Sequence, residues 1–98
     1  MTSLVWFTRR APSPLAAAVA AHGHHRIYEA IAVSEVLALM EQHSMRILII
    51  DSTVDDGAAR ELQGRFITLR LQPQATTAQI LWELSGIAVD PHLRAGTQ

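Results

Sequence analysis

The stretch Met45-Arg46-Ile47-Leu48-Ile49-Ile50-Asp51 decides the fold class of this chain. It holds four consecutive branched apolar residues and ends on a carboxylate, which is followed by the polar turn Ser52–Gly57. A strand with a single buried face alternates apolar and polar residues, whereas a strand covered by helices on both faces is continuously apolar. The stretch therefore predicts a central strand of a parallel sheet. Asp51 would then stand at the carboxyl end of that strand, where open α/β sheets place their ligand sites.

Strand-like and helix-like segments alternate on both sides of this stretch. Strands are expected at Leu4–Thr8, Arg26–Ala32, Arg46–Asp51 and Arg65–Leu71. Helices are expected to start at the capping residues Ser13, Ser34, Asp55 or Asp56, and Thr76 or Thr77, and to end near Gly23, His43, Gly64 and Gly86. Ile87–Val89 is expected either to add a short strand or to pack on the surface. This alternation implies right-handed crossovers, hence a three-layer α/β/α fold with a mostly parallel sheet of four strands.

Length and composition bound the class of protein. The 98 residues are expected to form one domain, residues 1–90, with a flexible tail at residues 91–98. A net charge of −1 gives no basic face for nucleic acid, and no apolar stretch approaches the length needed to cross a membrane. Arg9 and Arg10 follow the first apolar residues instead of preceding them, unlike a signal peptide. The absence of cysteine excludes disulfides and fits a cytoplasmic protein.

Four consecutive segments carry a family resemblance. They are Leu15–Gly23, an alanine-rich helix that ends in glycine, then Ile27–Ala30, then Val33–Met40, and then Ile47–Asp51. In this order and spacing the chain resembles, from about Leu4 to Gly86, the receiver domain of two-component response regulators. The resemblance implies a flavodoxin-like sheet with strand order 2-1-3-4 that lacks a full fifth strand–helix unit. It also implies that Asp51 occupies the position of the phosphorylated aspartate.

The chain departs from receivers where they bind Mg²⁺. The family carries an acidic pair just after the first strand, because phosphorylation of the aspartate needs a Mg²⁺ held by carboxylate oxygens. Here those positions read Thr8-Arg9-Arg10, and the sequence contains no lysine to match the conserved lysine of the family. We therefore expect no ordinary Mg²⁺-dependent phosphorylation. Three roles stay open for Asp51: it caps a turn or pairs with Arg9 or Arg10, it contacts a ligand or partner, or it accepts phosphate.

Other candidate sites are weaker. His22, His24 and His25 could bind a metal, but structural zinc needs four ligands, and a solvated helix C-terminus also favours histidine. Asp55 and Asp56 are explained by a turn and a helix cap. No phosphate-binding glycine loop, nucleophile elbow or spaced carboxylate pair is present, so we expect neither an enzyme nor a cofactor.

The sequence thus predicts a non-catalytic, receiver-like regulatory domain that acts through protein contacts. Without a full fifth unit, the fourth strand would be an open edge, which soluble proteins rarely leave uncovered. We therefore expect a homodimer, and the interface candidates are Ile67, Leu69, Leu71, Trp82, Ile87 and Val89. The alternatives are an atypical receiver that accepts phosphate on Asp51, and a small-ligand or metal-binding module that uses the cluster of His22, His24 and His25.

Overall fold

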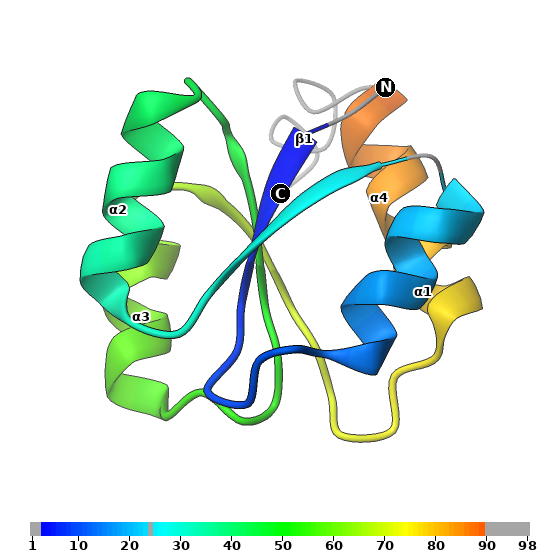
Figure 1. Ribbon diagram of the computed structural model, residues 1–98, viewed down its shortest axis with the longest axis horizontal. Coiled ribbons are helices and arrows are strands. Elements are labelled where there is room, and N and C mark those ends of the chain that lie inside the picture. Colours follow the sequence, from blue (N-terminus) through cyan, green and yellow to red (C-terminus); the bar gives the residue numbers. More distant parts are fainter. Residues whose placement is uncertain (1–2, 24, 90–98) are drawn as a thin grey trace.

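The computed structural model describes residues 3–23 and 25–89, in which four strands and four helices alternate (Figure 1). The elements are β1 (Ser3–Phe7), α1 (Pro14–Gly23), β2 (Arg26–Ala30), α2 (Val33–Gln42), β3 (Ile47–Ile50), α3 (Asp56–Gln63), β4 (Ile67–Arg70) and α4 (Thr77–Val89). All strand pairs are parallel, in the order β2-β1-β3-β4. This confirms the predicted fold class and its flavodoxin-like strand order.

Strand β3 is covered on both faces, as its apolar sequence predicts. Leu48, Ile49 and Ile50 are 0% exposed, and Ile47 is 9% exposed. Leu48 and Ile50 pack into the core beneath α2 and α3, whereas Ile47 and Ile49 pack into the core beneath α1 and α4. Each fully buried side chain of this size stabilises the fold by about 1.5–3 kcal/mol. Side chains from both faces of β3 thus form part of the packed interior.

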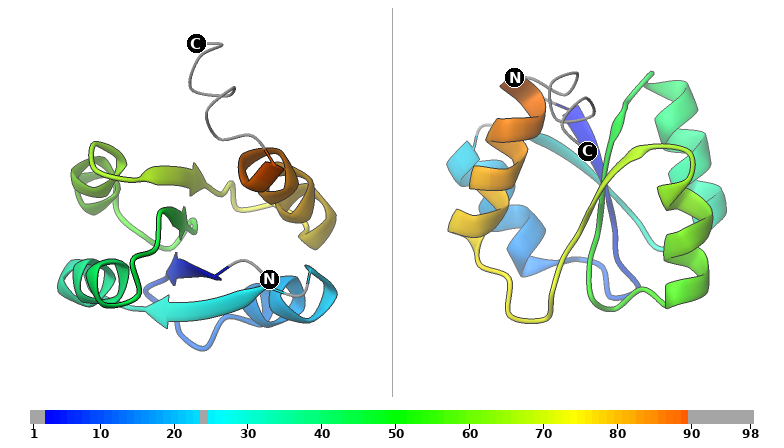
Figure 2. Two further views of the ribbon diagram at one scale, coloured as in Figure 1. Left: turned by 90° about the horizontal axis from the view of Figure 1, so that it is seen from above. Right: turned by 180° about the vertical axis from the view of Figure 1, so that it is seen from behind.

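The four helices form two layers on opposite faces of the sheet. Helices α2 and α3 cover one face, and helices α1 and α4 cover the other (Figures 1 and 2). Strand β1 serves the two layers in the same way as β3, because Val5 and Phe7 face one layer while Leu4 and Trp6 face the other. Within the described ranges, no helix has the length and apolar character that a membrane crossing requires.

Helix α4 returns to the face that α1 covers. The crossover from β3 to β4 runs through α3 on the opposite face, and a further right-handed crossover in that direction would again need a helix on the α3 face. Helix α4 packs beside α1 instead, through Ile80 and Leu84. No strand within residues 3–23 and 25–89 lies beyond β4, so the outer edge of β4 is open there.

Side chains cap three helices where the sequence predicts caps. Ser13, Asp55 and Thr76 each accept a hydrogen bond from the backbone N–H three residues later, at 3.2, 3.1 and 3.2 Å. A second hydrogen bond joins the same two residues: the backbone N–H of Thr76 donates to Gln79 Oε1 at 3.0 Å. This reciprocal pair forms a capping box and fixes where α4 begins.

The predictions for two helix ends are wrong. Ser34 does not cap α2: the N-cap is Ala32, and Glu35 Oε1 accepts the N–H of Ile31 at 3.0 Å instead. Gly86 does not end α4, which continues through it to Val89, so Ile87–Val89 forms no strand. A glycine inside a helix costs only about 1 kcal/mol relative to alanine. That cost is smaller than the gain from burying Ile80 and Leu84, which hold the helix on the sheet.

Gly23 permits close packing between α1 and α4, and this gives a testable prediction. A Cβ at Gly23 would clash with Leu81 Cδ2 and lie 2.5 Å from His25 Cδ2, whereas a Cβ at Gly64 would meet no atom within 4 Å. We expect Gly23→Ala to lower the free energy of unfolding by about 1 kcal/mol, at the low end for overpacking, because the atoms that must shift are the ends of the Leu81 and His25 side chains and not backbone. Gly64→Ala is the control and should be neutral or slightly stabilising. Equal effects in urea unfolding would contradict this close packing.

Candidate functional site

The carboxyl ends of β1 and β3 bring the predicted rim residues together. The Asp51 backbone N–H donates to the Phe7 carbonyl at 3.0 Å, and the Thr8 N–H donates to the Ala30 carbonyl at 2.9 Å. The parallel ladder therefore extends one residue beyond each strand. As a result, Thr8, which is only 1% exposed, lies beside the loop that follows Asp51.

Asp51 caps this loop. Its Oδ1 accepts the Thr53 backbone N–H at 2.9 Å and also the Thr53 hydroxyl. Such a turn is typical of an aspartate two residues before the N–H that it binds. The carboxylate of Asp51 is thus turned into its own loop, which agrees with the first of the roles predicted for it.

The Thr53 hydroxyl is the centre of the rim. It lies 3.2 Å from the Thr8 hydroxyl and accepts the Arg9 backbone N–H at 2.8 Å, while its own proton goes to Asp51. A hydroxyl has one proton, so Thr8 must be the donor to Thr53. Thr8 in turn accepts the Arg10 backbone N–H at 3.2 Å. The protons therefore point in one direction, from Arg10 through Thr8 and Thr53 to the carboxylate.

Arg9 pairs with Asp55 and not with Asp51. Its Nη2 lies 2.9 Å from Asp55 Oδ1, and its Nη1 donates to the Ile31 carbonyl at 2.7 Å. The guanidinium also lies 4.9 Å from the centre of the Phe7 ring. One side chain thereby links the ends of β1 and β2 to the start of α3. The predicted alternative of an Asp51 pair with Arg9 or Arg10 is not formed among the described residues.

Two aspartates at the start of α3 have lowered pKa values. The Arg9 guanidinium beside Asp55 lowers the pKa of that carboxyl, and the Ala58 N–H adds to this effect. Arg70, at the end of β4, contacts Asp56 and lowers its pKa in the same way. Both carboxyls are therefore stabilised as anions that already have a cationic partner from this chain.

The rim does not offer the ligands that Mg²⁺ needs. Mg²⁺ prefers several carboxylate or water oxygens in an octahedral arrangement. Asp51 is bound by Thr53, Asp55 is bound by Arg9, and Arg10 adds another positive charge. Across the described part of the chain, no three His, Cys, Asp or Glu side chains lie close enough to hold a metal ion.

The histidine cluster is only partly described. His22 is exposed in the last turn of α1, and His25 is half-buried just before β2. His24 lies outside the described residues. The sequence also allowed a simpler interpretation of the cluster, in which histidine is favoured at a solvated helix C-terminus. The position of His22 agrees with that interpretation.

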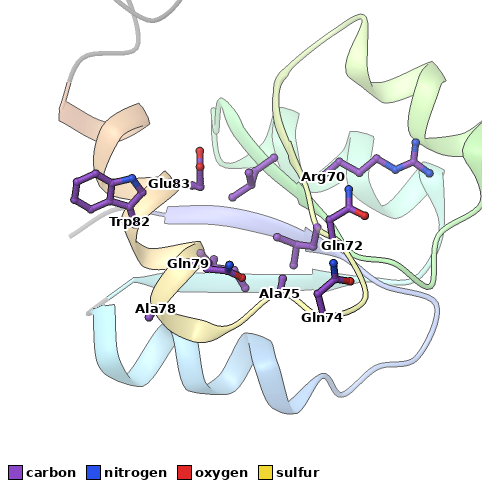
Figure 3. A pocket seen from close by; sticks show the side chains of 11 residues that line it. Arg70, Gln72, Gln74, Ala75, Ala78, Gln79, Trp82 and Glu83 are labelled. Atoms are coloured by element: carbon purple, nitrogen blue, oxygen red, sulfur yellow. The ribbon is translucent and has the colours of Figure 1, made fainter.

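The interface candidates divide into core and surface residues. Trp82 is 79% exposed and Ile67 is 39% exposed, whereas Leu71 is buried in the core and Leu69 is half-buried. Ile87 and Val89 belong to α4, but their side chains are outside the described part. An open groove of about 680 Å³ lies between β4 and α4 (Figure 3). Its walls are Leu69, Arg70, Leu71, Gln72, Gln74, Ala75, Ala78, Gln79, Ile80, Trp82 and Glu83.

The role of Thr53 was not predicted from the sequence. The signal was the spacing Asp51-Ser52-Thr53 directly after a buried strand, because an aspartate followed two residues later by a hydroxyl residue is typical of such turns. The groove could not be predicted, since it depends on which face α4 covers.

The role of Thr53 can be tested by removing its hydroxyl. Thr53→Val should lower the free energy of unfolding by about 1–3 kcal/mol, because it leaves the buried Thr8 hydroxyl without its acceptor. Ser52→Ala, at the exposed neighbouring position, is the control and should change stability little. Chemical denaturation of both variants measures the difference. A neutral Thr53→Val would contradict the proton arrangement described above.

The ion pair between Arg9 and Asp55 predicts a pH dependence. A folded-state pKa that is lowered stabilises the fold above the unfolded pKa of about 3.9, and the contribution is lost as pH falls through the folded value. A double-mutant cycle with Arg9→Gln and Asp55→Asn isolates the pair, since asparagine preserves the helix cap. The coupling in thermal unfolding should be present near pH 6 and should decrease as pH falls below about 3.9 and through the lowered folded-state pKa. A coupling that does not change with pH would contradict the pair.

Comparison with known proteins assigns no family to this fold and rim. No family model matches the chain, and the searches of curated proteins and of solved structures give no match either. The resemblance to receiver domains therefore stays a prediction that depends on the segments quoted for it, and the function of the chain is argued from its own geometry.

Proposed function

We propose that this chain is a non-catalytic, receiver-like regulatory domain of the cytoplasm that acts by binding protein. The observation that carries the proposal is the rim: the aspartate at the end of the central strand is bound by Thr53, and arginines stand where receivers have acidic residues. The order of the strands is the one expected for a receiver-like sheet. At the carboxyl end of that sheet, positive charges stand where receivers have negative ones.

The reversed charge opposes Mg²⁺-dependent phosphoryl transfer. A phosphoryl donor reaches a receiver aspartate together with Mg²⁺, which neutralises the developing charge. Arg9 cannot move aside freely, because it would lose its contacts with Asp55 and with the Ile31 carbonyl. Arg10 is exposed at the same turn and repels a divalent cation as well.

The surface supports a binding role more strongly than the rim supports chemistry. Trp82 is the most exposed of the large apolar side chains in the described residues, and it lies at the groove beside the open edge of β4 (Figure 3). Exposed tryptophan beside an apolar depression is typical of an interface anchor. Apolar area of this kind and an open strand edge are the two features that soluble proteins usually cover with a partner.

Incubation with acetyl phosphate and Mg²⁺, followed by intact-mass measurement, tests the proposal. We expect no phosphate adduct on the chain, under conditions in which an ordinary receiver domain used as positive control is modified. Asp51→Asn is the matched variant. An adduct on the unmodified chain that Asp51→Asn abolishes would overturn the proposal and favour an atypical receiver that accepts phosphate.

A further inference from the structure

The outer edge of β4 presents free backbone groups in a known pattern. The Leu71 N–H donates to the Ile50 carbonyl at 2.8 Å, so Leu71 and Leu69 direct their backbone groups toward β3. Successive residues of a strand alternate in direction, so the N–H and C=O groups of Thr68 and Arg70 point outward. These two residues can pair with an added strand, and no strand in the described ranges occupies that position.

The apolar groove lies directly beside this edge. Leu69 of β4 and Trp82 of α4 both line it, and Figure 3 shows the indole at its margin, projecting from the outer side of α4. An added strand alone would leave the groove and the indole open to solvent. A partner that brings both a strand and a helix on the same face would cover them together.

We propose that this partner is a second copy of the chain, paired with the first through antiparallel β4 strands about a two-fold axis at Leu69. The inference rests on the proposed binding function and names its partner. A two-fold axis perpendicular to the sheet keeps both α4 helices on the same face. The two grooves then merge into one space between the helices, and the two Trp82 side chains fill it.

The backbone pattern selects the position of the axis. With Leu69 on the axis, Thr68 of each copy lies opposite Arg70 of the other, and the two outward-facing pairs exchange about four hydrogen bonds. An axis at Thr68 would require residues that precede β4. An axis at Arg70 would place two guanidinium groups directly opposite each other, which is unfavourable.

Charge at the edge is compatible with this pairing. Arg70 is the only charged residue in β4, and a charge on an edge strand usually prevents pairing. Here Asp56 of the same copy forms an ion pair with Arg70, on the face that α3 covers. In each copy the charge of Arg70 is therefore balanced by Asp56. Thr68 of the other copy lies opposite Arg70.

The size of the surface sets the expected affinity. Eleven residues line the groove, fewer than the roughly 20–30 residues a side of a standard interface. Two tryptophans contribute a large share, because an aromatic side chain buries about 150–250 Å². We therefore expect a reversible dimer with a Kd of about 1–100 μM.

Engineered cysteines test the geometry directly, because the described chain has no cysteine of its own. Residues on the axis form a pair without hydrogen bonds, with Cα atoms about 4.5 Å apart, which a disulfide can bridge. Leu69→Cys should cross-link to a covalent dimer under mild oxidation. Ile67→Cys is the matched control: its side chain lies on the same face and is more exposed, yet this variant should form no cross-link because position 67 faces Leu71 of the other copy. A Leu69→Cys variant that stays reduced, or equal cross-linking of the Ile67→Cys variant, would overturn the proposal.

Sedimentation of the unmodified chain and of Trp82→Ala provides the second measurement. The chain should shift from monomer to dimer between about 1 and 100 μM, and Trp82→Ala should weaken the dimer at least about tenfold. Ile31→Ala, which removes another exposed side chain at the far side of the sheet, should leave the dimer unchanged. A monomer throughout would overturn the dimer without affecting the proposed function. A dimer that also accepts phosphate on Asp51 would overturn the proposed function alone.

Discussion

The burial of Ile47–Ile50 on both faces is the constraint on which the rest of the structure depends. A strand that exposes neither face needs a helical layer on each side and a strand neighbour on each edge. Alternate residues of β3 enter separate cores, so both layers are required at once. Strands β1 and β4 supply the edges, and the helices follow from the connections between them.

The polar rim is a consequence of where that strand leaves the core. Backbone groups beyond Asp51 and Thr8 have no ladder to continue, and the side-chain oxygens of Asp51, Thr53 and Thr8 accept the backbone N–H groups of Thr53, Arg9 and Arg10 there. Arg9 completes the rim by joining β1, β2 and α3 through its two hydrogen-bonded partners.

Much of this could be predicted from sequence because it depends on local patterns. The continuous apolar run gave β3, alternation of elements gave the parallel sheet, and Ser13, Asp55 and Thr76 gave three helix starts. The choice of Asp55 as the partner of Arg9 could not be predicted, because it depends on the orientation of the loop after Asp51. The helical path through Gly86 was missed for a similar reason, since packing of α4 on the sheet outweighs the weak preference of one glycine.

The two ends of this architecture differ in what they leave available. At the rim, Arg9, Asp51 and the threonine hydroxyls have partners within the chain, whereas at the outer edge of β4 backbone groups, a groove and Trp82 are exposed in the described part of the chain. Both features depend on β3 being the central strand. Native-state hydrogen exchange measured by NMR tests that claim most directly. The amides of Leu48, Ile49 and Ile50 should be the slowest in the chain and exchange only through global unfolding; exchange of these amides through local opening, as fast as that of the Thr68 and Arg70 amides in dilute solution, would contradict it.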